Sequence, residues 1–287
     1  MQQRWLVISN CQTYGLAHCL SLLCVDAQVF PMDIWEFRNN IHDAANIIEK
    51  YDVVIVSQEI ISIPDNKLDC ARRLEIIPSI VFGAYHPDLC YARAENTILN
   101  SPLDAYNSII AIAAYNNGLS VQDALRFYNA NTYQKAGYFD MWGPSVRGIA
   151  QEFEAYGFNI GRQIINWSRT SAFMYSINHP KINCLFDIAR EFLQKICVAA
   201  YSTQCLPSDN LATGAIFPVY TEIAERYGVK GDYTFKIFNK YELMNLESYV
   251  RASYASYDEQ KIHHRLINVT EEFLPRYNAV SSLMTKG

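Results

Sequence analysis

The stretch from Trp5 to Leu23 constrains the fold of this chain more than any other, because it joins a predicted strand to a predicted helix through a very short turn. Trp5–Ser9 is an apolar run rich in branched side chains, which is typical of a buried strand. Three leucines then follow at helical spacing, at positions 16, 20 and 23, and indicate an amphipathic helix. The turn between the two is Asn10-Cys11-Gln12. In an open α/β sheet, ligands and nucleophiles are placed in such turns, at the carboxyl ends of the strands.

Cys11 is the residue of this turn that could act as a nucleophile. The backbone N–H groups in the first turn of a helix point outward and favour negative charge, so a thiolate there is stabilised. The thiolate is the nucleophilic form of cysteine, and we therefore expect Cys11 to ionise below its ordinary pKa. The alternative is that Cys11 is a small buried residue that closes the turn.

Further apolar runs predict a parallel sheet. The clearest is Asp52–Ser57, a continuous β-branched run as expected of a strand covered on both faces. Ala27–Phe30, closed by Pro31, and Ile76–Phe82, interrupted by Pro78, are two more candidate strands. Predicted helices lie between them, around residues 41–50 and 69–74. This alternation predicts an α/β fold in which a parallel sheet carries helices on both faces.

The rest of the chain is predicted to be largely helical. Ser101-Pro102 and Ser120 are helix-start signals, Pro144 opens another helix that ends near Gly157, and an apolar stripe marks a long helix from Ile182 to Ile196. Further helices are predicted at 217–227, 241–254 and 270–283, with strands at 170–177 and 232–238. The absence of a linker or repeat favours a single domain, 1–287, with a core at about 1–200 and a helical extension at about 201–287.

Composition excludes several classes of function. The 287 residues carry a net charge of −5 and no basic run, which argues against nucleic-acid binding. The apolar runs are too short to cross a membrane, and the amino terminus is a poor signal peptide, so we expect a cytoplasmic protein. None of the eight cysteines forms a C-x-x-C pair, and the adjacent His263 and His264 would not face one site on a helix, so no metal centre is predicted.

Three polar segments that follow apolar runs are the candidate site. They are Asn10-Cys11-Gln12, Tyr85-His86-Pro87-Asp88 and Asn178-His179-Pro180. A cysteine beside a histidine is the pattern of nucleophilic acyl chemistry, in which the histidine removes the thiol proton. Amides and backbone N–H groups near the cysteine would stabilise an oxyanion. Gln58, at the end of the clearest strand, could reach the same edge of the sheet. Each histidine could equally be structural.

The same three segments resemble those of a known family, the WcbI-type polysaccharide biosynthesis proteins. Ser9-Asn10-Cys11-Gln12 is similar to the family's G-N-C-Q opening, with Ser9 in place of the usual glycine. The loop Gly83–Leu89 resembles its aromatic-H-P-D segment, and Asn178-His179-Pro180 resembles its N-H-P segment. The resemblance covers roughly residues 5–200.

This resemblance implies a coenzyme A-binding acetyltransferase that acts on a saccharide hydroxyl in capsule or exopolysaccharide biosynthesis, with a core similar to that of the SGNH hydrolases. Acetyl-coenzyme A and a saccharide acceptor would be its partners, and the oligomeric state stays open. Catalytic roles are expected for Cys11, His86 and His179. Oxyanion or substrate contacts are expected from Asn10, Gln12, Gln58, Asp88 and Asn178. Contacts to coenzyme A are expected from Ser9, Tyr85, Arg93 and Arg169, since arginine matches phosphate geometry.

Two routes and two other functions remain open at this stage. Cys11 could accept the acetyl group and pass it on, or a histidine could activate the sugar hydroxyl directly, and spacing does not say which histidine. The same Cys–His pair would also serve a thioesterase or carbohydrate esterase. A non-catalytic module that binds a nucleotide or a sugar is the third possibility.

Overall fold

The computed structural model describes residues 2–94, 97–169, 171–260 and 267–285. Their contacts group the chain into two compact units. The first consists of residues 1–81, 146–167 and 178–211, and the second of residues 82–145, 168–177 and 212–287. That the chain forms a single domain stays a prediction. His263 and His264 lie outside the described residues.

The first unit is built on a parallel four-stranded sheet with the order β2-β1-β3-β4. Its strands are β1 (Gln3–Ser9), β2 (Ala27–Asp33), β3 (Val53–Val56) and β4 (Leu74–Ile76). Its helices are α1 (Thr13–Leu23), α2 (Ile34–Asn39), α3 (Ala44–Ile48), α4 (Gln58–Ile61), α9 (Gly161–Trp167) and α10 (Ile182–Lys195). Helix α8 (Trp142–Ala155) begins in the second unit and continues in the first.

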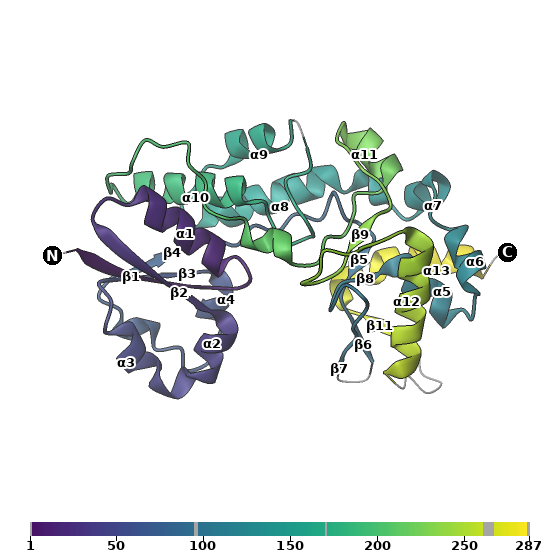
Figure 1. Ribbon diagram of the computed structural model, residues 1–287, viewed down its shortest axis with the longest axis horizontal. Coiled ribbons are helices and arrows are strands. Elements are labelled where there is room, and N and C mark those ends of the chain that lie inside the picture. The colour runs from purple at the N-terminus through teal and green to yellow at the C-terminus, as the bar shows by residue number, and fades with distance from the viewer. Residues whose placement is uncertain (1, 95–96, 170, 261–266, 286–287) are drawn as a thin grey trace. The chain divides into compact units, whose positions relative to one another are not determined.

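Helices cover both faces of this sheet, as the alternating pattern predicts (Figure 1). On one face α1 packs against β1, β2 and α10, and the Trp5 ring meets Phe192 edge-on with 6.3 Å between centroids. On the other face Leu6, Ile8 and β3 side chains form a core with α2 and α3. Because β1 is buried on both faces, its sequence is apolar throughout rather than alternating.

The parallel register brings the carboxyl ends of the strands to one edge. Ser9 pairs with Asp33, and Val56 lies between Ile8 and Ile76. The segments that leave these ends therefore emerge side by side. We call this edge the site edge.

Several predicted elements are wrong in detail. Strand β2 continues through Pro31 to Asp33, because an edge strand tolerates a residue without an N–H donor. The predicted helix at 69–74 is a single 3₁₀ turn, Leu68–Cys70, followed by β4. The predicted strand at 76–82 is irregular after Ile76. Residues 171–177, placed in the second unit, form bends rather than a strand.

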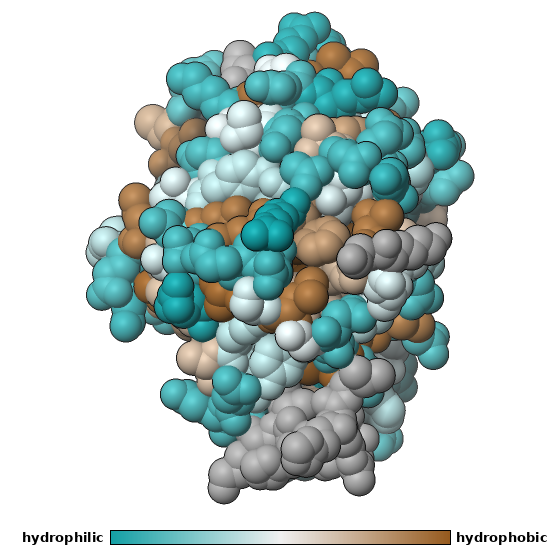
Figure 2. All heavy atoms as spheres, turned by 90° about the vertical axis from the view of Figure 1, so that its right-hand side faces the viewer, coloured by the Kyte–Doolittle hydropathy of each residue, from teal (hydrophilic) through white to brown (hydrophobic). Residues whose placement is uncertain are grey.

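The second unit combines helices with short strands. Its helices are α5 (Ile109–Asn116), α6 (Val121–Leu125), α7 (Ala130–Lys135), α11 (Thr221–Tyr227), α12 (Leu246–Glu259) and α13 (Leu274–Met284). Its strands are β5 (Leu89–Cys90), β6 (Ala92–Ala94), β7 (Thr97–Ile98), β8 (Asn107–Ser108), β9 (Phe235–Lys236), β10 (Leu243–Met244) and β11 (Asn268–Val269). Figure 2 faces the side with α6, α7 and α13, where hydrophobic side chains cross the middle of a mostly hydrophilic face.

The predicted helix start at Ser101 is also wrong. The Ser101 hydroxyl donates to the Tyr106 carbonyl, and Asp104 takes a left-handed conformation with φ 61°, so this segment is a turn. Helix α5 starts instead at Ser108, whose side chain accepts from the Ala111 N–H. Ser120 caps α6 as predicted. Among the described residues, none of the helices combines the length and apolar character that a membrane crossing requires.

Candidate active site

The turn between β1 and α1 lies at the site edge and forms the centre of the candidate site. Gln12 is the residue that fixes its position. Its Nε2 donates to the Ile80 carbonyl at 2.9 Å and to the Asn178 carbonyl at 3.0 Å, while its Oε1 accepts from the Ile80 N–H at 3.0 Å. The side chain is 2% exposed, and its two bonds to Ile80 are buried, while its bond to the Asn178 carbonyl is partly buried. One amide group thus ties together three segments that are far apart in the sequence.

Asn10 is held by a second set of hydrogen bonds. Its Nδ2 donates to Glu59 Oε1 at 3.0 Å and to Ser79 Oγ at 2.9 Å, and the Ser79 hydroxyl donates to Glu59 Oε2 at 3.2 Å. This leaves Asn10 Oδ1 facing the Gln12 N–H, 3.0 Å away. The amide orientation of Asn10 is therefore set by Glu59 and Ser79.

Glu59 and Ser79 were missed from the sequence. Glu59 could have been identified by its position, because it directly follows Gln58 just after β3. Gln58 lies where it is expected, with its Oε1 accepting from the Ser79 N–H at 2.9 Å. Nothing in the sequence distinguishes Ser79, which lies in the irregular segment after β4.

Cys11 keeps part of its surface open to solvent at the site edge, which contradicts the alternative of a buried, turn-closing residue, although protein atoms surround most of its sulfur. Its Sγ lies 3.7 Å from both Asn10 Oδ1 and the Asn178 carbonyl oxygen, and Asn178 Nδ2 lies 3.9 Å from it. The thiol thus sits between two asparagines, mostly among hydrogen-bond acceptors.

The expected lowering of the Cys11 pKa is wrong. Surrounding protein atoms desolvate the thiol and the Glu59 carboxylate adds a negative charge, and together they raise its pKa to about 12. The contact with the residue's own backbone N–H lowers the pKa, by less than desolvation raises it. The protein in this state therefore carries Cys11 as a neutral thiol at neutral pH.

The Asn178-His179-Pro180 segment comes to the same edge, just before α10. The Asn178 carbonyl accepts from Gln12, as described above. His179 is buried, and desolvation lowers its pKa to about 4, so the imidazole is neutral at pH 7. In the first unit the structure therefore brings together Asn10, Cys11, Gln12, Gln58 and Asn178, with His179 adjacent in the chain. The buried Ser9 precedes them at the end of β1.

The Tyr85–Asp88 segment lies in the second unit, inside its core. His86 is 2% exposed, and its ring nitrogens face the Pro218 and Met174 carbonyls without well-formed hydrogen bonds. Burial lowers its pKa to about 4. Tyr85 is fully buried in an aromatic cluster. The catalytic role of His86 and the cofactor role of Tyr85 stay predictions.

Asp88 is also fully buried in the second unit. Its Oδ1 accepts from Tyr138 Oη at 2.8 Å and the Ile110 N–H at 3.0 Å, and its Oδ2 accepts from Tyr220 Oη at 2.7 Å and from the Ser108 hydroxyl at 2.5 Å. Burial nevertheless raises its pKa to about 6. These contacts are those of a structural carboxylate, and its substrate role stays a prediction.

The two arginines assigned to phosphates, Arg93 on β6 and Arg169, are both exposed in the second unit. Their contacts with coenzyme A stay predictions. Among the described residues, no group of three or more His, Cys, Asp and Glu side chains is arranged to hold a metal ion.

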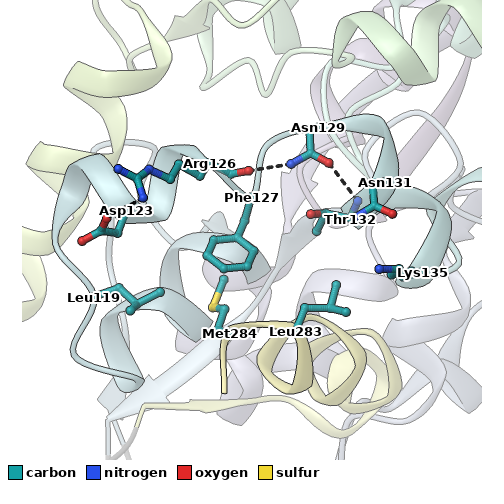
Figure 3. Close-up of a pocket in the computed structure, with 10 residues that line it drawn as sticks. All are labelled: Leu119, Asp123, Arg126, Phe127, Asn129, Asn131, Thr132, Lys135, Leu283 and Met284. Carbon is teal, nitrogen blue, oxygen red and sulfur yellow. Dashed lines mark hydrogen bonds and ion pairs between the residues drawn. The ribbon is translucent and has the colours of Figure 1, made fainter. Parts of the chain in front are cut away.

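A pocket of about 400 Å³ opens in the second unit beside α6, α7 and α13 (Figure 3). Figure 3 shows the Phe127 ring and the Met284 side chain in its apolar part, and Arg126 turned toward Asp123. Its lining contains neither cysteine nor histidine. The pocket therefore lacks the cysteine–histidine pair that the sequence predicts for the site.

Comparisons with known proteins agree with the resemblance noted in the sequence. A family model described as polysaccharide biosynthesis enzyme WcbI matches residues 4–200. No curated protein matches the chain. One solved structure is similar, with a TM-score of 0.65 and 14% identity over 98% of this chain and 96% of that one. It is described as WcbI, a novel polysaccharide biosynthesis enzyme, in a native form without a disulfide bond between coenzyme A and one of its cysteines. At this identity, the likeness shows a shared fold.

Proposed function

Because this chain belongs to the WcbI family of polysaccharide biosynthesis enzymes, we propose that it transfers an acetyl group from acetyl-coenzyme A to a saccharide hydroxyl. The observation that carries the proposal is the partly exposed Cys11 thiol at the site edge, held between the amides of Asn10 and Asn178. The carboxyl edge of an open α/β sheet is where ligands bind. The similar solved structure is described in terms of coenzyme A and a cysteine, which supports placing the thiol end of coenzyme A near Cys11.

The proposal includes an SGNH-hydrolase-like arrangement of the first unit. Its support is the parallel order β2-β1-β3-β4, with the candidate nucleophile in the turn after the first strand.

We favour direct transfer over an acetyl-cysteine intermediate. Desolvation of the sulfur raises the Cys11 pKa to about 12, which disfavours the nucleophilic thiolate at pH 7. In direct transfer the acceptor oxygen bonds to the acetyl carbon, the carbon–sulfur bond breaks, and the hydroxyl proton passes to His179 and then to the coenzyme A sulfur. The depressed pKa of His179 keeps its imidazole neutral and able to take the proton, although it also makes it a weaker base than one matched to neutral pH.

The amide groups of the site take different parts. Both Nε2 hydrogens of Gln12 and both Nδ2 hydrogens of Asn10 are used within the protein, so these two residues position the turn. The Asn178 Nδ2 group points toward the Cys11 sulfur and is the side-chain donor that we assign to the developing oxyanion.

Release of free coenzyme A thiol tests the proposal, measured with and without oligosaccharides obtained by mild acid hydrolysis of the producing organism's surface polysaccharide. We expect sugar-dependent release and acetylated sugar by mass spectrometry. His179→Asn should lower turnover about a hundredfold, the scale of losing a general base, and His86→Asn should have a much smaller effect. If coenzyme A thiol is released at the same rate with and without the oligosaccharide, the protein is instead a thioesterase.

Cys11→Ser separates the two routes. Direct transfer predicts that this variant keeps turnover within about tenfold of the parent, since serine is similar in size. The exposed Cys205, changed to serine, is the matched control. A loss of a hundredfold or more in Cys11→Ser alone would show that the thiol carries the acetyl group. An absence of thermal stabilisation by millimolar coenzyme A would argue for a function without this substrate.

A further inference from the structure

A pocket of about 350 Å³ opens in the first unit beside α2 and α4. Its volume lies in the range of small-molecule sites, about 300–1,000 Å³. Three of its lining residues are polar and three are apolar: Arg38, Glu59, Ser62, Ile41, Ile63 and Pro64.

The position of this pocket follows from the sheet. Helix α2 follows β2 directly, and α4 follows β3 after Ser57, so both helices leave the site edge (Figure 1). Glu59 belongs both to the pocket lining and to the network that orients Asn10. The pocket is thus connected through one carboxylate to the residue that contacts the Cys11 thiol.

The chemistry of the lining matches a sugar ring better than a nucleotide. A pyranose presents hydroxyls around its edge and C–H groups on its faces, and a guanidinium, a carboxylate and a serine hydroxyl beside isoleucine and proline side chains offer partners for both. The Glu59 carboxylate would repel the phosphates of coenzyme A. Next to the pocket, Trp35 is 66% exposed and the Arg38 guanidinium lies over its ring, 5.4 Å from the centroid. An exposed, oriented indole of this kind is a surface on which a further sugar ring can stack.

We propose that this pocket holds the acceptor saccharide, an inference that rests on the proposed function. Each Glu59 carboxylate oxygen already accepts one hydrogen bond, from Asn10 or from Ser79, and has a second lone pair that a sugar hydroxyl can use. The carboxylate therefore holds the acceptor and Asn10 at the same time. Glu59 is a positioning residue in this arrangement, and Arg38 and Ser62 bind the ring.

Ser62→Trp is the sharpest test, because it fills the pocket from an exposed position at the end of α4. The matched control is Ser21→Trp, since Ser21 is exposed near the other end of α1, away from the site edge. With acetyl-coenzyme A and the oligosaccharide fraction described above, we expect Ser62→Trp to raise the KM for the oligosaccharide at least tenfold and to leave the KM for acetyl-coenzyme A within twofold. Arg38→Ala should raise the same KM severalfold. An unchanged oligosaccharide KM in Ser62→Trp overturns the inference.

Calorimetric titration with the oligosaccharide fraction separates this inference from the proposed function. If the protein transfers no acetyl group but binds oligosaccharide, and Ser62→Trp abolishes that binding while Ser21→Trp does not, the pocket assignment stands and the transferase proposal fails. If both tryptophan variants bind as the parent does, or if the parent binds no oligosaccharide, the pocket assignment fails.

Discussion

Replacing Gln12 by alanine should loosen the site edge and lower the stability of the first unit. The change removes two buried hydrogen bonds to Ile80 and one partly buried bond to the Asn178 carbonyl, which keeps its contact with the Cys11 thiol. Each lost bond costs about 1 kcal/mol, and a buried group left unsatisfied costs about 1–3 kcal/mol. Because water has partial access to the Asn178 carbonyl, the total cost of the lost bonds and unsatisfied groups lies near the lower end of the range that these values give. We expect a loss of about 3–5 kcal/mol, a large share of the 5–15 kcal/mol typical of a folded domain.

Urea unfolding, followed together with amide hydrogen exchange, measures this effect. The Ile80 amide should lose protection in Gln12→Ala, because its acceptor is gone. Gln194→Ala is the matched control: Gln194 is exposed on α10, and we expect a change within about 0.5 kcal/mol. The reasoning is refuted if Gln12→Ala loses less than about 1 kcal/mol and the Ile80 amide stays protected.

Three further outcomes are expected. Since the Cys11 pKa is raised to about 12, its alkylation by iodoacetamide should be slow at pH 7 and still accelerate above pH 10; a plateau below pH 9 would contradict the raised value. His86 has a folded-state pKa of about 4 against an ordinary 6.5, so it contributes stability above pH 6.5 that is lost as pH falls toward 4. Between pH 7 and pH 5, the free energy of unfolding in urea should fall by about 2 kcal/mol less in His86→Phe than in the parent. An unchanged pH dependence in the variant would refute this. Gly15→Ala should cost about 1–3 kcal/mol, because a Cβ there would lie 2.6 Å from a leucine of α10. Gly148→Ala, with no atom within 4 Å of the new Cβ, should be neutral or stabilising in the same melting assay, and equal effects of the two changes would count against this packing argument.

The sequence predicts the central strands and the longest helices well because their patterns are unambiguous. Val53–Val56 is entirely apolar and β-branched, and the stripe along Ile182–Lys195 keeps the helical period. The helix start at Ser101 failed for a different reason. Serine followed by proline also begins turns, and only the bond from Ser101 to the Tyr106 carbonyl, a contact formed in the folded chain, decides between them.

The candidate site also has features that local sequence patterns predict and features that they do not. That Asn10-Cys11-Gln12 leaves a strand at the sheet edge follows from local patterns, and so does the position of Gln58. The Cys11 pKa does not, because it depends mainly on the atoms that surround the sulfur only after folding, and to a smaller extent on Glu59. The roles of Glu59 and Ser79 are likewise set by tertiary contacts, since no local pattern connects either residue with Asn10.

The Gln12 amide also has a consequence for the order in which the protein folds. Its partners are 68 and 166 residues away in the sequence. Contacts of such separation form after local ones, because closing long loops costs entropy before any bond is gained. During synthesis, β1 and α1 can pair and pack early, but the turn between them reaches its final geometry only once residue 178 has left the ribosome. A chain truncated before that point would retain Cys11 and lack the arrangement around it.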